Sequence, residues 1–178
     1  MIETARLILR AWREEDVAPF HAMGQDAEVM RYLGAPTTWA GARDMVNEQI
    51  ATAARFGRCL WVVERRSDAA LLGFCGVEPG PKGSPIDGLP EIGWRLVREA
   101  WGVGYATEAA RAALRAEWSR GSQRVFAITV PANRRSWGLM ERLGMTRVVD
   151  GDFDHPDLPP DHPLRPHILY RIDRPAHD

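Results

Sequence analysis

The chain has 178 residues, of which 45% are hydrophobic and 26% charged, and its formal net charge is -1. This balance is typical of one globular domain, and it excludes a disordered, fibrous or membrane-embedded chain. The near-neutral charge gives no general electrostatic reason to bind nucleic acid or an anionic membrane. We therefore predict a single domain over residues 1–178 with neither of these partners. No segment approaches the ~20 apolar residues of a membrane span, and the first residues lack an apolar signal core, so a cytoplasmic location is expected.

The first elements are a short strand and two helices. Residues 7–9 are apolar between two arginines and predict a strand, and the acidic residues 14–16 are typical of the first turn of a helix that continues to Met23. Thr38 is suited to cap a second helix, whose apolar positions recur at helical spacing up to Ala53. Gly57 ends that helix.

The middle of the chain predicts strands. Residues 60–63 and 71–77 are β-branched or aromatic runs on either side of a polar segment, which indicates an antiparallel hairpin. A Gly- and Pro-rich loop over 79–90 follows, and 91–97 is then expected to be a central strand. Cys59 and Cys75 lie in apolar surroundings, so buried reduced thiols are favoured over a disulfide or a nucleophile.

The last third alternates between strands and helices. After a glycine turn, a helix is predicted over 107–118 and a strand over 125–130. Asn133 is placed to cap a helix that ends at Leu143. Residues 150–166 include five Asp and five Pro, which predicts a long loop without a regular element before a closing strand at 167–172. The chain is therefore a mixed α/β (α+β) domain.

The most informative segment is the turn over 101–109, Trp-Gly-Val-Gly-Tyr-Ala-Thr-Glu-Ala, between a strand and a helix. Small residues at 102, 104 and 106 allow close approach of a ligand, and consecutive amides at a helix N-terminus are suited to a pyrophosphate. A tight connection without a ligand is the simpler alternative. A Rossmann fingerprint fits poorly because its third glycine would fall at Thr107, and no Gly-Lys-Ser/Thr follows for a P-loop.

This turn resembles the acetyl-CoA loop of the GNAT superfamily, Gln/Arg-x-x-Gly-x-Gly/Ala, through Trp101-x-x-Gly104-x-Ala106. Trp at the first position departs from the pattern and looks like the branch that contains the ribosomal-protein N-terminal acetyltransferases. The opening Thr4-Ala-Arg-Leu-Ile-Leu-Arg10, the later Asn133-x-x-Ser136 and the ending Leu143-Gly144-Met145 are similar to the same family.

The resemblance implies a GNAT fold, in which a central, mostly antiparallel sheet of about seven strands is flanked by helices on both faces. It also implies acetyl-CoA as cosubstrate and an amine acceptor as the second partner. The residues expected to bind the cosubstrate are Leu96, Val97, Trp101, Gly102, Val103, Gly104, Tyr105, Ala106, Thr107, Asn133 and Ser136.

Acetyl transfer to an amine needs a neutral nucleophile, because a primary amine is largely protonated at pH 7, and a nearby base therefore helps. Glu91 is the candidate base, since it begins the central strand and alternation places it on the same face as Gly93 and Arg95. A solvent-exposed glutamate at a strand end is the alternative. The resemblance implies that Ser136 approaches the sulfur, and that a central-strand amide near Leu96 or Val97 binds the oxyanion.

One residue departs from the family pattern at the expected site. Related enzymes place a tyrosine acid four residues after Ser136, but this chain has Met140, which cannot donate a proton. We therefore expect an acetyl-CoA-dependent N-acetyltransferase acting on a protein N-terminus or a small amine, with a non-catalytic acyl-CoA-binding or regulatory protein as the alternative. The oligomeric state stays open, with a homodimer as one option.

The tail loop over 150–166 is dense in histidine and aspartate. Its spacing matches no zinc pattern, so no metal site is predicted. Long irregular segments are often functional lids. This loop could therefore reach over the acceptor site, where Asp152, Asp154 and Asp157 would suit a cationic acceptor.

Overall fold

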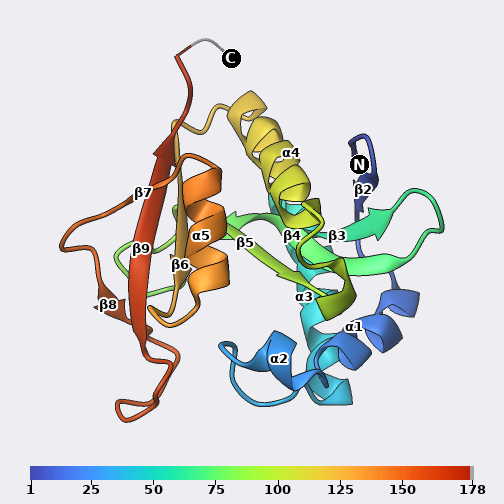
Figure 1. The fold of residues 1–178 in the computed structure, drawn as a ribbon, viewed down its shortest axis with the longest axis horizontal. Coiled ribbons are helices and arrows are strands. Elements are labelled where there is room, and N and C mark those ends of the chain that lie inside the picture. Colours follow the sequence, from blue (N-terminus) through green and yellow to red (C-terminus); the bar gives the residue numbers. More distant parts are fainter. Residues whose placement is uncertain (177–178) are drawn as a thin grey trace.

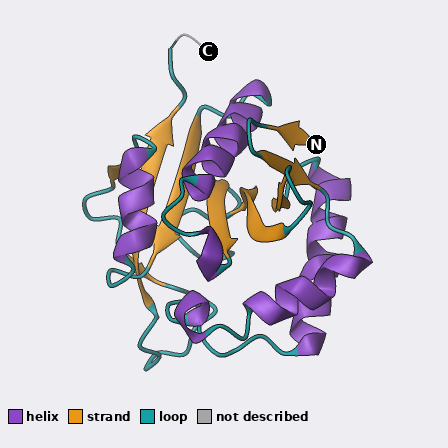
Figure 2. Ribbon diagram, turned by 45° about the vertical axis from the view of Figure 1, so that its right-hand side comes forward, coloured by secondary structure: helices purple, strands orange, loops and turns teal. Residues whose placement is uncertain are grey.

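A computed structural model describes residues 1–176 as one twisted sheet with helices on both faces (Figures 1 and 2). The last two residues of the predicted 1–178 domain lie outside the described residues. The strands are β1 (Ile2–Glu3), β2 (Leu7–Arg10), β3 (Leu60–Arg65), β4 (Leu71–Pro79), β5 (Pro90–Leu96), β6 (Arg124–Thr129), β7 (Thr146–Arg147), β8 (Phe153–Asp154) and β9 (Pro166–Asp173).

The helices are α1 (Val17–Met23), α2 (Ala27–Met30), α3 (Trp39–Phe56), α4 (Tyr105–Ser119) and α5 (Arg134–Arg142), with short 3-10 segments at Glu14–Asp16 and Arg98–Ala100. The expected caps are present: the hydroxyl of Thr38 accepts from the Gly41 amide, and Gly57 ends α3 at a φ of 65°. The sequence pattern missed α2, because a four-residue helix is too short to show a hydrophobic period.

The strand order is β1-β2-β3-β4-β5-β6-β9-β7, with β8 paired to β9. Neighbours are antiparallel except β5 and β6, which are parallel. The mixed, mostly antiparallel sheet is thus confirmed. Within residues 1–176 the sheet has nine strands where about seven were expected, and three of them, β1, β7 and β8, have only two residues each. The prediction of no regular element in 150–166 is wrong at β8, where Phe153 pairs with His167.

Apolar side chains fill both sides of the sheet. On one side, α4 contributes small residues such as Ala109 and Ala113, which allow the helix to lie close to β4 and β5. On the other side, α1 and α3 pack on the sheet through residues such as Phe20 and Val46. Cys59 and Cys75 are buried and free. Burial is the main cause that raises the pKa of each thiol to about 12. The prediction of reduced, buried cysteines is confirmed.

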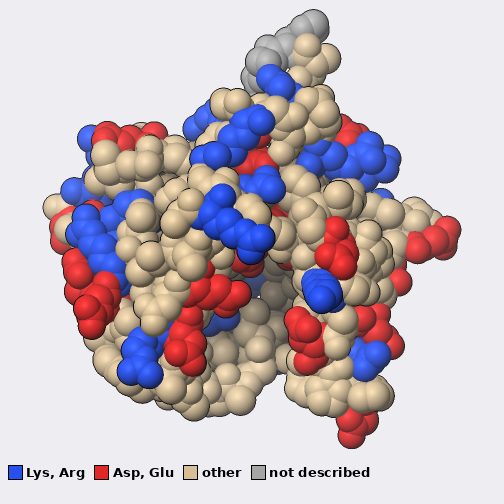
Figure 3. All heavy atoms as spheres, turned by 180° about the vertical axis from the view of Figure 1, so that it is seen from behind, with Lys and Arg blue, Asp and Glu red and all other residues tan. Residues whose placement is uncertain are grey.

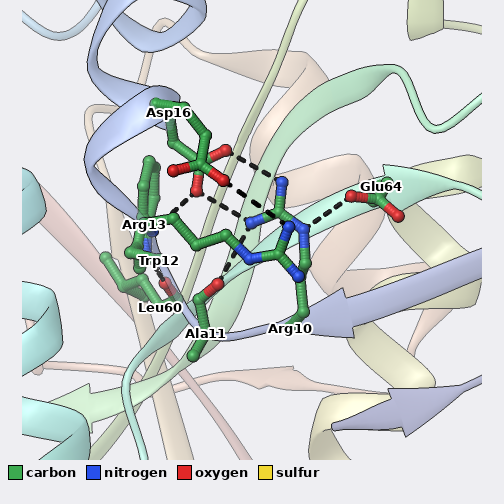
Figure 4. Close-up of polar contacts among 8 residues, drawn as sticks. Arg10, Ala11, Trp12, Arg13, Asp16, Leu60 and Glu64 are labelled. Carbon is green, nitrogen blue, oxygen red and sulfur yellow. Dashed lines mark hydrogen bonds and ion pairs between the residues drawn. The ribbon is translucent and has the colours of Figure 1, made fainter.

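A buried ion-pair network holds α1 against the sheet (Figure 4). Both terminal nitrogens of Arg10 in β2 donate to the Asp16 carboxylate over 2.8 Å, and its Nε donates to Glu64 Oε2 in β3 over 2.6 Å. Next to it, the Trp12 indole donates to the carbonyl oxygen of Leu60. Because Asp16 lies directly before α1, this network fixes the start of that helix over β2 and β3.

Within residues 1–176, no helix is both long and apolar enough to cross a membrane.

Candidate active site

The centre of the sheet is open because β5 and β6 diverge. In the described part of the chain the two strands pair at one position, Glu91 opposite Phe126, although both continue for several residues beyond it. Figure 3 shows the surface hollowed between the half of the molecule that contains α1 and α3 and the half that contains β9. We call the space between residues 91–96 and 126–129 the β5–β6 opening.

The hydrogen bonds of β5 decide which main-chain amides point into this opening. The Val97 amide donates to the Leu72 carbonyl oxygen on the β4 side over 2.8 Å. Because the direction of hydrogen bonding alternates along an antiparallel strand, the Leu96 amide points the other way, toward β6. Of the two amides that the sequence suggested for the oxyanion, Val97 is therefore already paired, and Leu96 is the one directed into the opening.

The predicted glycine turn lies directly after β5. Gly102 and Gly104 have φ values of 76° and 87°, which glycine adopts without strain, and α4 starts at Tyr105, two residues before its predicted start. Within residues 1–176, the main-chain amides of 102–107 donate to no protein acceptor. A row of unpaired amides at the positive end of a helix is the arrangement that binds anionic groups.

The start of α5 lies beside this turn. Asn133 caps the helix, since its side-chain oxygen accepts from the Ser136 amide at 3.3 Å. The Ser136 hydroxyl is partly exposed and has no hydrogen-bond partner in the described residues. The guanidinium of Arg135 lies 4.6 Å above the ring of Trp101, which joins α5 to the turn. Met140, at the position where related enzymes have tyrosine, is buried in the core.

Glu91 is partly buried rather than exposed, and it is paired with a second glutamate. The register of β4 and β5 places Glu78 directly opposite Glu91, so both carboxyl groups leave the same face of the sheet. Burial, and then the nearby charge of Glu78, raise the pKa of Glu91 to about 8. Burial also raises the pKa of Glu78, although Gln49 of α3 donates to its Oε2 at 3.0 Å.

Sequence reasoning missed Glu78 and Gln49. The sequence did contain a signal for Glu78. Residues that flank the connection between two antiparallel strands lie opposite one another, and Glu78 and Glu91 flank the predicted loop over 79–90. Gln49 had no such signal, because its position beside Glu78 depends on how α3 packs on the sheet.

Comparison with known proteins identifies the family. A family model described as an acetyltransferase (GNAT) domain matches residues 6–146. The chain belongs to the GNAT acetyltransferase family. The family transfers acyl groups from acetyl-CoA, so this GNAT chain is an acetyl-CoA-dependent acyltransferase.

This GNAT protein is similar to proteins of known sequence and to solved structures. It is 32% identical to the uncharacterized protein YkkB of Bacillus subtilis, over 80% of this chain and 83% of that protein. The crystal structure of a GNAT-family acetyltransferase from Bacillus anthracis is 26% identical with a TM-score of 0.76, over 97% of both chains. RimL, a ribosomal L7/L12 α-N-protein acetyltransferase solved in complex with coenzyme A, shares the fold at 18% identity and a TM-score of 0.72, over 96% of this chain and 95% of its own.

In this GNAT protein, the N-terminal segment holds the turn in place. Thr4 Oγ1 donates to Glu108 Oε1 over 2.7 Å, and Arg6 donates to both Glu108 oxygens and to the carbonyl oxygen of Val103. Partial burial alone would raise the pKa of Glu108, but the hydrogen bonds from Thr4 and Arg6 outweigh it and lower that pKa. The opening segment 4–10 and the glycine turn 101–109, which both resemble the family pattern in sequence, therefore contact each other in the fold.

The acidic tail loop of this GNAT protein uses its carboxylates internally. Asp152 pairs with Arg147, Asp154 lies 3.1 Å from the Arg165 Nε, and Asp157 lies 4.0 Å from the His155 ring. Burial lowers the pKa of His155, so the contact of Asp157 with that ring is not an ion pair at pH 7. A role of the three aspartates toward a cationic acceptor stays a prediction. The loop does approach the predicted 79–90 loop, since a methyl group at Gly83 would lie 3.8 Å from Pro156 Cβ. Residues 1–176 contain no group of three or more His, Cys, Asp or Glu side chains arranged to hold a metal ion.

Proposed function

We propose that this protein is an N-acetyltransferase that moves an acetyl group from acetyl-CoA directly to a primary amine. The observation that supports this most is the joint presence, at one opening in the sheet, of a row of unpaired amides over 102–107 and a carboxyl group, Glu91, whose pKa is raised to about 8. The first feature suits a diphosphate, and the second suits proton transfer from an ammonium group.

The cosubstrate site is assigned to the turn and its neighbours. The amides of 102–107 would bind the diphosphate. The guanidinium of Arg6, which pairs with Glu108, donates to the Val103 carbonyl oxygen and lies 4.5 Å from the Tyr105 ring, would hold the turn in the conformation that presents these amides. When bound, acetyl-CoA supplies an activated acetyl group as a thioester. The Leu96 amide, directed into the opening, would stabilise the oxygen on which negative charge develops.

Glu91 is assigned as the general base, acting directly or through a water molecule. An ordinary glutamate, with a pKa near ~4.3, is a poor acceptor for a proton from an amine. The raised pKa of Glu91 lies closer to the pKa of an amine, so proton transfer from the amine to Glu91 costs less free energy. The carboxyl group of Glu78 lies directly opposite Glu91, and two acidic groups at this point of the sheet favour an acceptor that arrives as a cation.

Ser136 is assigned to the departing sulfur, as a donor from the first turn of α5. Its hydroxyl is not engaged by another described residue, so it is available for this contact. Met140 is buried and provides no acid. A thiol with a pKa of ~8.5 is a good leaving group, so a hydrogen bond from Ser136 or water is sufficient.

Release of free thiol from acetyl-CoA, measured over a panel of amines, tests this function. The panel includes N-terminal peptides of ribosomal proteins, because RimL is described as acting on L7/L12, together with polyamines and aminoglycosides. Amine-dependent thiol release that is lost in Glu91→Gln is the expected result. Tight binding of acetyl-CoA without turnover on any amine would instead favour a non-catalytic acyl-CoA-binding or regulatory protein.

A further inference from the structure

Arg95 of β5 is a charged side chain that the proposed reaction does not use. Its guanidinium lies between two rings, with its Cζ 5.6 Å from the Phe20 centroid and 5.3 Å from that of Phe74. Its Nε is buried without a hydrogen-bond partner, and burial lowers its pKa to about 10. Across residues 1–176, no carboxylate forms an ion pair with it.

An unpaired charge in such surroundings is costly. Taking an ion out of water is unfavourable unless the ion gains a partner, and stacking on two rings offsets only part of that cost. Other arginines in this chain that lie in the interior have acids beside them, as Arg10 does with Asp16 and Glu64. The arrangement at Arg95 is therefore that of a cation whose partner is supplied by a ligand.

The position of Arg95 relates it to Glu91. Residues 91, 93 and 95 alternate onto one face of β5, and the residue between the two charged side chains is Gly93. A methyl group at Gly93 would already approach Leu60 Cδ2 at 3.4 Å. The strand therefore presents a carboxyl group and a guanidinium on one face, with the Leu60 side chain over the glycine between them, and the two charged residues are about 13 Å apart between Cα atoms.

Arg95 leaves β5 on the face opposite α4, whereas Trp101 of the glycine turn packs against the core clusters on both faces. Ile92 and Leu96, which alternate with these residues, pack into the core that α4 covers, whereas Arg95 contacts the ring of Phe20 in α1. The turn over 102–107 begins α4. An anion at Arg95 is thus more readily explained by the acceptor than by the phosphates of the cosubstrate.

We propose that the acceptor has an anionic oxygen group, a carboxylate or phosphate, that binds Arg95 while its primary amine lies at Glu91. This inference rests on the proposed function, because it assigns the acceptor to the same opening. The four-residue spacing of Glu91 and Arg95 along the strand favours an acceptor whose amine and anionic group are separated by several atoms over an α-amino acid, in which a single carbon separates them. It fits a chain with an amine at one end and an anion at the other, such as an ω-amino acid or a short peptide.

Matched acceptors test the proposal. Thiol release is compared for ε-aminocaproate, its uncharged primary amide and an aminoalkyl phosphate of equal length. We expect kcat/KM to be about tenfold or more higher for an anionic acceptor than for the amide, because a charge-assisted hydrogen bond is lost in the latter. The two anionic compounds distinguish carboxylate from phosphate. Equal rates for all three acceptors would overturn the proposal without any variant.

Substitution of Arg95 adds a second test. Arg95→Met keeps a long apolar side chain between the rings and should abolish the preference for an anion, chiefly through KM, whereas Arg95→Lys should retain part of it. Arg98→Met is the control, because that arginine is mostly exposed and pairs with Asp26. An unchanged preference in Arg95→Met, or a loss of acetyl-CoA affinity in this variant, would contradict an acceptor role.

A binding measurement separates this proposal from the proposed function. Calorimetric titration of ε-aminocaproate into the coenzyme A-bound protein needs no turnover. Binding that is lost in Arg95→Met supports the anion site even if no amine is acetylated. If Arg95→Met does not fold, the same titration with Arg95→Lys and with the uncharged amide decides the question: equal binding of acid and amide overturns the anion site.

Discussion

Arg6 and Glu108, which are 102 positions apart in the sequence, form an ion pair with 2.7 Å between the Arg6 Nε and Glu108 Oε2. The same guanidinium donates to the carbonyl oxygen of Val103 over 3.0 Å. The pair therefore anchors the first turn of α4 and the glycine turn before it.

Replacing Arg6 should weaken cosubstrate binding more than it weakens the fold. We expect Arg6→Met to raise the Kd for acetyl-CoA about tenfold, because a charge-assisted contact and the anchoring of the turn are both lost. Since Arg6 is 45% exposed, the loss of stability should stay below about 1 kcal/mol. Calorimetry and thermal melting measure the two effects. Arg13→Met, which removes another exposed arginine, is the control and should change neither.

Gly104 provides a sharper test of the turn. Gly104→Val places a branched side chain at a φ of 87°, close to the Arg6 guanidinium, and should abolish binding of acetyl-CoA. Gly121→Val is the matched control, because Gly121 also has a positive φ of 98° but lies after α4 with open space around its Cα. Both variants should lose similar stability. Normal acetyl-CoA affinity in Gly104→Val would remove the turn from the cosubstrate site.

The glutamate pair predicts the pH dependence of the reaction. Because Glu91 must be ionised to accept a proton, kcat/KM should rise with pH through about 8 for an acceptor amine of higher pKa. Glu91→Gln should lower kcat by about a hundredfold or more and remove this inflection. In Glu78→Gln the inflection should move to lower pH, since one cause of the raised pKa is gone. An unchanged profile in both variants would exclude the pair from proton transfer.

The same pair predicts an effect of pH on stability. The folded protein keeps a proton on Glu91 up to about pH 8, whereas an unfolded chain releases it near ~4.3. The folded state therefore binds more protons between these values, and this group removes stability as the pH rises through them. Glu91→Gln should thus be more stable than the natural protein at about pH 9, and this advantage should shrink toward about pH 5. Thermal melting at several pH values measures it, and a destabilised variant at high pH would contradict the sign.

The Arg10 network predicts a large effect on folding. Arg10→Met leaves the carboxylate of Asp16 buried without its partner, which should cost about 3–5 kcal/mol. Urea denaturation measures the loss, and adding Asp16→Asn should restore part of it. Arg65→Met, whose partner Asp68 is exposed, should leave the urea midpoint nearly unchanged. A similar small change in Arg10→Met would show that this network does not hold α1.

The sequence by itself determined the local structures. Thr38 and Asn133 cap helices, and Gly57 ends one, because these residues act on the backbone within three or four positions of themselves. The turn before α4 could also be predicted from the sequence, since two glycines between a strand and a helix are typical of a tight turn. These short-range rules also located the strands that have four or more residues.

Only the tertiary structure decided which distant residues meet. The contact of Glu108 with Thr4 and Arg6 and the contact of Gln49 with Glu78 depend on how helices and strands pack, which no local pattern encodes. The divergence of β5 and β6 is likewise a property of the assembled sheet, and the pairing of the Val97 amide with Leu72 in β4 decides that Leu96, rather than Val97, faces the opening. The chemistry of Glu91 and Arg95 arises from burial, and burial exists only once the chain has folded around them.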